Sequence, residues 1–75
     1  MKSAGIWQIT IARLDGNPAH RLKYAQVRSP ILGEVAEWPT HDGKTIKAKI
    51  GYIRHFAAKE RGNLGVWDIK ADEVA

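Results

Sequence analysis

Basic and aromatic side chains are the residues of this sequence with the clearest capacity to bind a ligand. Lys47 and Lys49 alternate with apolar residues, so an extended chain places both ammonium groups on one face. Arg21 and Lys23 have the same spacing. Cations on a sheet face can follow phosphates, and aromatic rings beside them can stack on bases. We therefore predict a nucleic-acid interface composed of basic and aromatic residues: Arg21, Lys23, Lys44, Lys47, Lys49, Arg54, Lys59, Arg61, Tyr52 and Trp38.

The same basic face has a simpler interpretation, because lysines on the outside of a small β-protein keep it soluble and protect its strand edges. Trp7 and Trp67 lie on the apolar side of their predicted strands, so only Trp38, next to Pro39, is expected to be exposed. A second hypothesis is therefore a protein-interaction module or a self-associating accessory protein. A groove near Trp38 and Pro39 would bind a peptide, or a strand edge would pair with another chain or a second copy.

The distribution of charge favours an anionic partner. The formal net charge is +4. Residues 1–33 contain five basic and one acidic residue, residues 34–63 contain six basic and four acidic residues, and residues 64–75 contain one basic and three acidic residues. A basic body of this kind attracts RNA or DNA electrostatically. No segment approaches the ~20 apolar residues of a membrane span, and the first residues lack the apolar run of a signal peptide. We expect a small, free-standing cytoplasmic protein with no membrane partner.

The remaining polar side chains do not form a recognisable catalytic or metal-binding motif. His20, His41 and His55 are far apart in the chain, and the sequence contains no cysteine to complete a zinc site. Glu34 and Glu37 fall on opposite faces of a short strand, so we expect them to pair with lysines across the neighbouring hairpin. No glycine-rich phosphate loop and no serine-nucleophile motif is present. The sequence predicts a non-enzymatic protein without a metal or cofactor.

Five short strands, separated by turn residues, are predicted to position these side chains. They cover residues 6–14, 18–28, 34–38, 44–56 and 64–71. The apolar sides of the first, fourth and fifth strands carry Trp7, Ile9 and Ile11; Ile46, Ala48 and Ile50; and Trp67, Ile69 and Ala71. The second strand has an alternative, a helix with Asn17 as its cap and Pro18 as its first residue.

Gly51 interrupts the alternation of the fourth strand, which predicts a bulge or bend there. Two alternatives are a split into two short strands and a strand followed by a short helical turn near residues 55–61. The polar residues of 57–63 predict a mobile loop tip.

Two further segments carry expectations about packing. Ile31 and Leu32 lie in the loop of residues 28–33, and we expect them to tuck under the sheet as an apolar plug; an exposed contact site is the alternative. Residues 72–75 predict a loose acidic terminus in which Val74 is the only anchor.

These elements predict a single all-β domain that spans residues 1–75. No long amphipathic helix is available to cover an open sheet, so five strands with one apolar face must close on themselves or pair with a second copy. We therefore expect a small five-stranded barrel of the SH3-like or OB-like kind. Such an architecture supports many activities and does not itself specify one.

Overall fold

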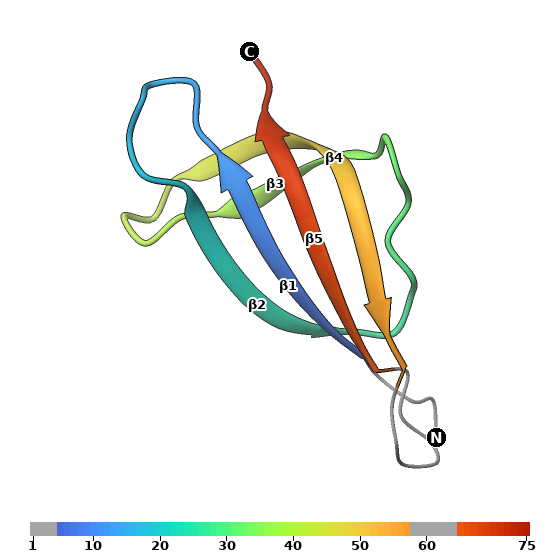
Figure 1. The fold of residues 1–75 in the computed structure, drawn as a ribbon. Helices are drawn as coiled ribbons and strands as arrows, with labels where there is room; N and C mark the ends of the chain where they lie inside the picture. The colour runs from blue at the N-terminus through green and yellow to red at the C-terminus, as the bar shows by residue number, and fades with distance from the viewer. Residues whose placement is uncertain (1–4, 58–64) are drawn as a thin grey trace.

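The protein is an all-β chain in which five strands form one curled sheet (Figure 1). The computed structural model describes residues 5–57 and 65–75. Its strands are Gly5–Ala12 (β1), His20–Gln26 (β2), Val35–Pro39 (β3), Thr45–Phe56 (β4) and Val66–Glu73 (β5). The predicted all-β class is confirmed, and β2 shows that the helical alternative for residues 18–28 is wrong. No helix among the described residues has the length and apolar character needed to cross a membrane.

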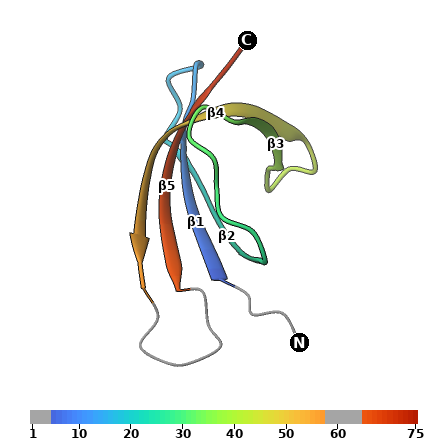
Figure 2. The same cartoon turned by 90° about the vertical axis from the view of Figure 1, so that its right-hand side faces the viewer.

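The sheet has the strand order β2-β1-β5-β4-β3, and it mixes parallel and antiparallel pairs. β1 and β5 run parallel, whereas β1–β2, β4–β5 and β3–β4 are antiparallel. Figure 2 shows that β4 arches over and carries β3 in front of the concave side of the sheet. The result is a curled half-barrel whose two edges are β2 and β3, rather than a closed barrel.

The concave face holds the core because the apolar residues of each strand recur at every second position. In β1, β4 and β5 the buried side chains are those that the alternation predicts: Trp7, Ile9, Ile11, Ile46, Ala48, Ile50, Trp67, Ile69 and Ala71. Leu22 and Tyr24 of β2 pack against this cluster from one edge of the sheet. The convex face carries the alternate, mostly polar positions.

A bulge at Gly51 reverses the alternation inside β4. The register against β5 shifts between Ile50 and Tyr52, which confirms the predicted bend. Because of this extra residue, Ile50 faces the core while Tyr52 lies on the convex face. β4 continues as a strand through Phe56 and residue 57 is not helical, so a helical turn is wrong for residues 55–57. Residues 58–61 of that turn and residues 58–63 of the predicted mobile tip lie outside the described residues.

The loop between β2 and β3 differs from the predicted apolar plug. Ile31 and Leu32 are 61% and 65% exposed. The loop backbone is bound to the sheet: the Gly33 amide donates to the Ile50 carbonyl at 2.8 Å, and the Ile50 amide donates to the Glu34 carbonyl at 2.9 Å. With its backbone held there, the loop directs both aliphatic side chains to solvent.

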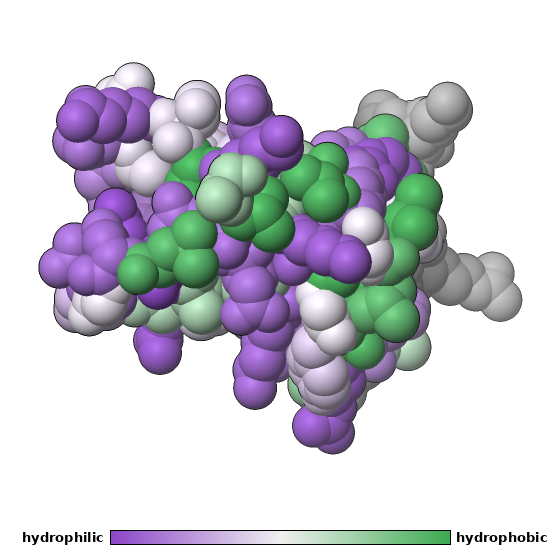
Figure 3. All heavy atoms as spheres, turned by 90° about the horizontal axis from the view of Figure 1, so that it is seen from above, coloured by the Kyte–Doolittle hydropathy of each residue, from purple (hydrophilic) through white to green (hydrophobic). Residues whose placement is uncertain are grey.

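The acidic end of the chain is more ordered than predicted. β5 extends to Glu73, and Asp72 lies opposite Lys49 of β4. The Val74 amide donates to the Lys47 carbonyl at 2.9 Å, so Val74 anchors the end through its backbone. Figure 3 views the molecule from above, and in that view several groups of apolar side chains lie between hydrophilic ones.

Candidate nucleic-acid interface

Basic side chains from β2, β4 and β5 come together with polar side chains of β1 on the convex face, in two adjacent rows. In one row Lys23, Gln8, Asp68 and Arg54 are neighbours from β2 across to β4. In the next row the neighbours are Arg21, Thr10, Lys70 and Tyr52. We call these eight residues, together with Phe56 at the end of β4, the convex patch.

Two exposed aromatic rings lie at the β4 side of the convex patch. Tyr52 is 42% exposed and Phe56 is 45% exposed. The Lys70 Nζ lies 5.3 Å from the centroid of the Tyr52 ring, and the Arg54 Cζ lies 4.8 Å from that of Phe56. Each ring therefore has a cation over one of its faces, an arrangement that is itself weakly attractive. Tyr52 and Phe56 are four positions apart along β4, so their Cα atoms are about 13 Å apart.

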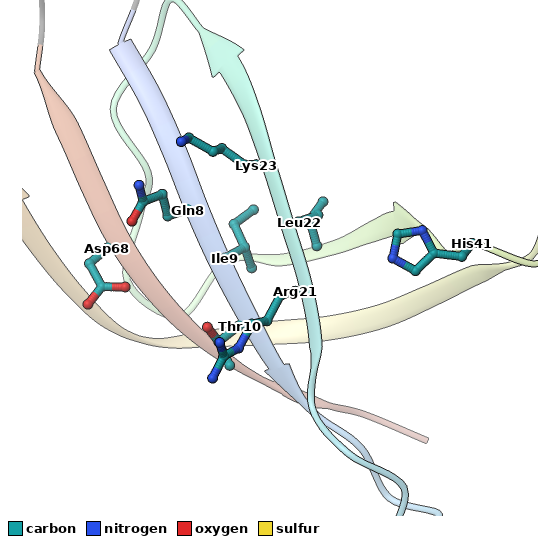
Figure 4. Close-up of a pocket in the computed structure, with 8 residues that line it drawn as sticks. All are labelled: Gln8, Ile9, Thr10, Arg21, Leu22, Lys23, His41 and Asp68. Carbon is teal, nitrogen blue, oxygen red and sulfur yellow. The ribbon is translucent and has the colours of Figure 1, made fainter.

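A hollow of about 630 Å³ lies at the β1–β2 part of the patch, and Ile9, Leu22 and His41 also line it (Figure 4). Figure 4 shows Lys23 extending from β2 over β1, on the side of the sheet where Gln8 and Asp68 also lie. These polar groups supply ammonium, amide and carboxylate functions within one concavity. The hollow therefore offers both charge and hydrogen-bonding groups to a ligand.

The other predicted interface residues are not part of this patch. Lys47 lies directly opposite Glu37, and Lys49 lies directly opposite Asp72. Both lysines are exposed, but each has a carboxylate-bearing residue as its cross-strand neighbour, which weakens the local positive potential. Lys44 lies beyond them, at the turn between β3 and β4. Lys59 and Arg61 lie outside the described residues.

The expected exposure of Trp38 is wrong. Trp38 is 4% exposed, and its indole Nε1 donates a hydrogen bond to the Tyr24 hydroxyl at 3.1 Å. The curl of β4 carries β3 over the concave face and turns Trp38 into the core. This removes Trp38 as a surface for base stacking.

The two glutamates behave differently from one another. Glu37 lies opposite Lys47 in the predicted hairpin, whereas Glu34 does not pair with a hairpin lysine. Instead both carboxylate oxygens of Glu34 accept hydrogen bonds from Arg28, at 2.9 and 3.0 Å. These hydrogen bonds to Glu34 raise the pKa of the Arg28 guanidinium. The pair holds the two ends of the β2–β3 loop together.

In each of two turns, hydrogen bonds lower the pKa of an aspartate. The pKa of Asp42 is lowered first by the hydrogen bond from the Thr40 hydroxyl and then by the Lys44 amide. The pKa of Asp15 is lowered chiefly by the hydrogen bond from the Asn17 amide, at 3.0 Å. These carboxylates act as local acceptors that shape the two Asp-Gly turns.

The histidines do not assemble a metal site in the part of the chain that the structure describes. His20 and His41 approach to 5.1 Å between ring centroids, and His55 stacks on Trp67 at 4.3 Å. No cluster of three or more potential metal ligands is present among residues 5–57 and 65–75.

Sequence reasoning missed Lys70, Asp68, Gln8 and Thr10 as members of the patch. Alternation in residues 64–71 already places Asp68 and Lys70 on the outer side of the last strand. Their neighbours depend on the register between β4 and β5, which the Gly51 bulge sets. Comparisons with protein-family models, with curated proteins and with solved structures find no match for this chain.

Proposed function

We propose that this protein is a non-enzymatic binder of single-stranded nucleic acid, which it contacts through the convex patch. The observation that carries the proposal is the meeting of four basic side chains and two exposed aromatic rings on one sheet face. With Asp68 as its one acidic member, the patch has a formal charge of +3. Such a charge favours a polyanion.

The parts of the patch would have different tasks. Arg21 and Lys23 contact phosphates, while Tyr52 and Phe56 stack on bases. Gln8 offers a carbonyl and an amide to base edges. A single strand fits this surface better than a duplex, because only unstacked bases present their faces to aromatic side chains.

The test is a titration of labelled single-stranded oligonucleotides, followed by fluorescence anisotropy at two or more salt concentrations. Each phosphate neutralised contributes about 0.7 to the slope of log affinity against log salt. Arg21→Gln combined with Lys23→Gln is expected to reduce that slope by about 1.4. Tyr52→Ala combined with Phe56→Ala should weaken binding by about 1–3 kcal/mol for each base that stacks, and should leave the slope unchanged.

The matched control is Lys47→Gln combined with Lys49→Gln, which removes the same charge from positions opposite Glu37 and Asp72. We expect this control to change the slope less than the β2 variant does. An absence of binding at low salt contradicts the proposal. So does an equal reduction of the salt slope in the Arg21/Lys23 variant and in the Lys47/Lys49 control.

Two finer expectations stay predictions. The five strands and the curl of the sheet support an SH3-like or OB-like assignment, and the superposition of an experimental structure on members of both folds would test it. A cytoplasmic location is open to test by cell fractionation.

The alternative function, a protein-interaction module, is supported by a different feature. The groove between the two sheet edges is partly apolar and lies beside Trp38 and Pro39.

A further inference from the structure

The two edge strands of the half-barrel flank a groove that we call the seam. β2 and β3 are the two ends of the strand order, so they are not hydrogen-bonded neighbours in the sheet. A groove of about 490 Å³ runs between them and is lined by side chains from both edges: Leu22, Lys23, Tyr24, Arg28, Ala36, Glu37, Trp38 and Pro39.

Side chains, rather than backbone hydrogen bonds, bridge the seam. The Trp38 indole reaches the Tyr24 hydroxyl at 3.1 Å, and the His20 Nε2 lies 3.0 Å from the Pro39 carbonyl oxygen. Two aromatic side chains that meet end to end span more than the 4.7–4.9 Å between paired strands. The seam therefore has an apolar floor and two rims of strand backbone.

Of the two rims, β2 is the better template for another strand. β3 is five residues long and ends at Pro39, which has no amide to donate and whose carbonyl already lies against His20. β2 is seven residues long and contains no proline. Strand addition to an open edge is a recurrent mode of peptide recognition.

The side chains of β2 define what such a strand must carry. Leu22 and Tyr24 point to the core side, and the exposed Arg21 and Lys23 point to the convex side. A strand that pairs with this edge places its own residues alternately beside apolar and cationic neighbours. Acidic residues at every second position, with apolar residues between them, complement this edge.

A second copy of the chain is a poor occupant. Pairing β2 with β2 of another molecule would bring Arg21 and Lys23 close to their own counterparts, and like charges in cross-strand positions are destabilising. On the opposite rim, Glu37 repels an acidic strand, which directs that strand to β2.

We propose that the seam binds an extended segment of a partner protein in which acidic and apolar residues alternate, added as a strand to β2. The segment would lie over Tyr24 and Trp38 and bring the half-barrel closer to closure. This inference shares Arg21 and Lys23 with the proposed nucleic-acid interface, but it uses the β2 edge and not the rings of Tyr52 and Phe56.

The test uses three synthetic ten-residue peptides with the isotope-labelled protein. One alternates Asp and Val, the second has the same composition with Asp and Val in separate blocks, and the third alternates Lys and Val. The alternating Asp-Val peptide is expected to bind at least about tenfold more tightly than the block peptide, a difference of about 1.4 kcal/mol. Its amide chemical-shift changes should be concentrated in β2 and beside Trp38.

Charge reversal provides the decisive comparison. The variant Arg21→Glu combined with Lys23→Glu should no longer bind the alternating Asp-Val peptide and should bind the Lys-Val peptide instead. The variant Arg54→Glu combined with Lys70→Glu, on the far side of the convex face, should still prefer the Asp-Val peptide. Tyr52→Ala combined with Phe56→Ala should also retain Asp-Val binding, which separates this site from the proposed nucleic-acid site.

Three outcomes overturn the proposal. The first is equal affinity for the alternating and block Asp-Val peptides. The second is a set of chemical-shift changes centred on β4 and β5. The third is a dimer, detected by sedimentation, whose interface maps to the seam.

Discussion

At the scale of single residues, Gly5 shows how closely the core is packed. A β-carbon at this buried position would lie 2.2 Å from the Cζ3 atom of Trp67 and 3.1 Å from the Gly65 carbonyl oxygen. Trp67 is itself buried, and His55 stacks against its ring. Position 5 therefore has no room for a side chain beside the Trp67 ring.

Gly5→Ala is expected to lower the free energy of unfolding by about 1–3 kcal/mol, because the added methyl group overpacks the core against Trp67. Urea denaturation followed by tryptophan fluorescence measures this change. The matched control is Gly51→Ala, since a β-carbon at Gly51 meets nothing closer than an Asp72 carboxylate oxygen at 3.7 Å. If both substitutions have the same effect, the packing argument fails.

At the scale of elements, the loop between β2 and β3 is a rigid support for exposed apolar side chains. Besides the Gly33 and Glu34 contacts with Ile50, the Trp7 indole donates to the Arg28 carbonyl at 3.1 Å. The Arg28 guanidinium lies 4.8 Å from the Trp7 ring centroid, and its salt bridge with Glu34 closes the loop. The loop is thus held by its polar groups, which explains why Ile31 and Leu32 are left outside.

Replacing both exposed aliphatic residues, in the variant Ile31→Ser combined with Leu32→Ser, is expected to leave the free energy of unfolding within about 0.5 kcal/mol of the original. Ile69→Ala, in the core, should cost about 2–5 kcal/mol by comparison. Chemical denaturation of the three proteins provides the measurement. A large loss for the loop variant would mean that these side chains pack against the sheet after all.

At the scale of the whole molecule, stability is expected to fall from the centre of the sheet to its edges. β5 lies between β1 and β4, and it contributes Trp67, Ile69 and Ala71 to the core. β3 has a single strand neighbour and an open seam on its other side. The parallel β1–β5 pair also joins the beginning of the chain to its end, so the sheet is complete only when the last strand is in place.

Amide hydrogen exchange should reveal this gradient. The amides of β5 that bond to neighbouring strands are expected to exchange about tenfold more slowly than those of β3 that bond to β4, because an edge strand opens locally at lower cost. Nuclear magnetic resonance measures both sets in one sample. Uniform protection across the five strands would show that the seam is closed in solution by contacts stronger than side-chain bridges.

The amino-acid sequence by itself determined the inner sides of β1, β4 and β5. Alternation is a local property, so Trp7, Ile46 and Trp67 identify core faces without knowledge of their neighbours. Asp-Gly turns and the interruption at Gly51 are equally local signals.

Only the tertiary structure decided which strands are neighbours and in what register. Tyr52 meets Lys70, and Arg54 meets Asp68, because the bulge shifts β4 against a strand that begins ten residues after its end. Trp38 is buried because a distant strand supplies Tyr24 as its partner. Ile31 is exposed because its loop is bound through the backbone. Each outcome depends on contacts between segments far apart in the chain, which no local pattern encodes.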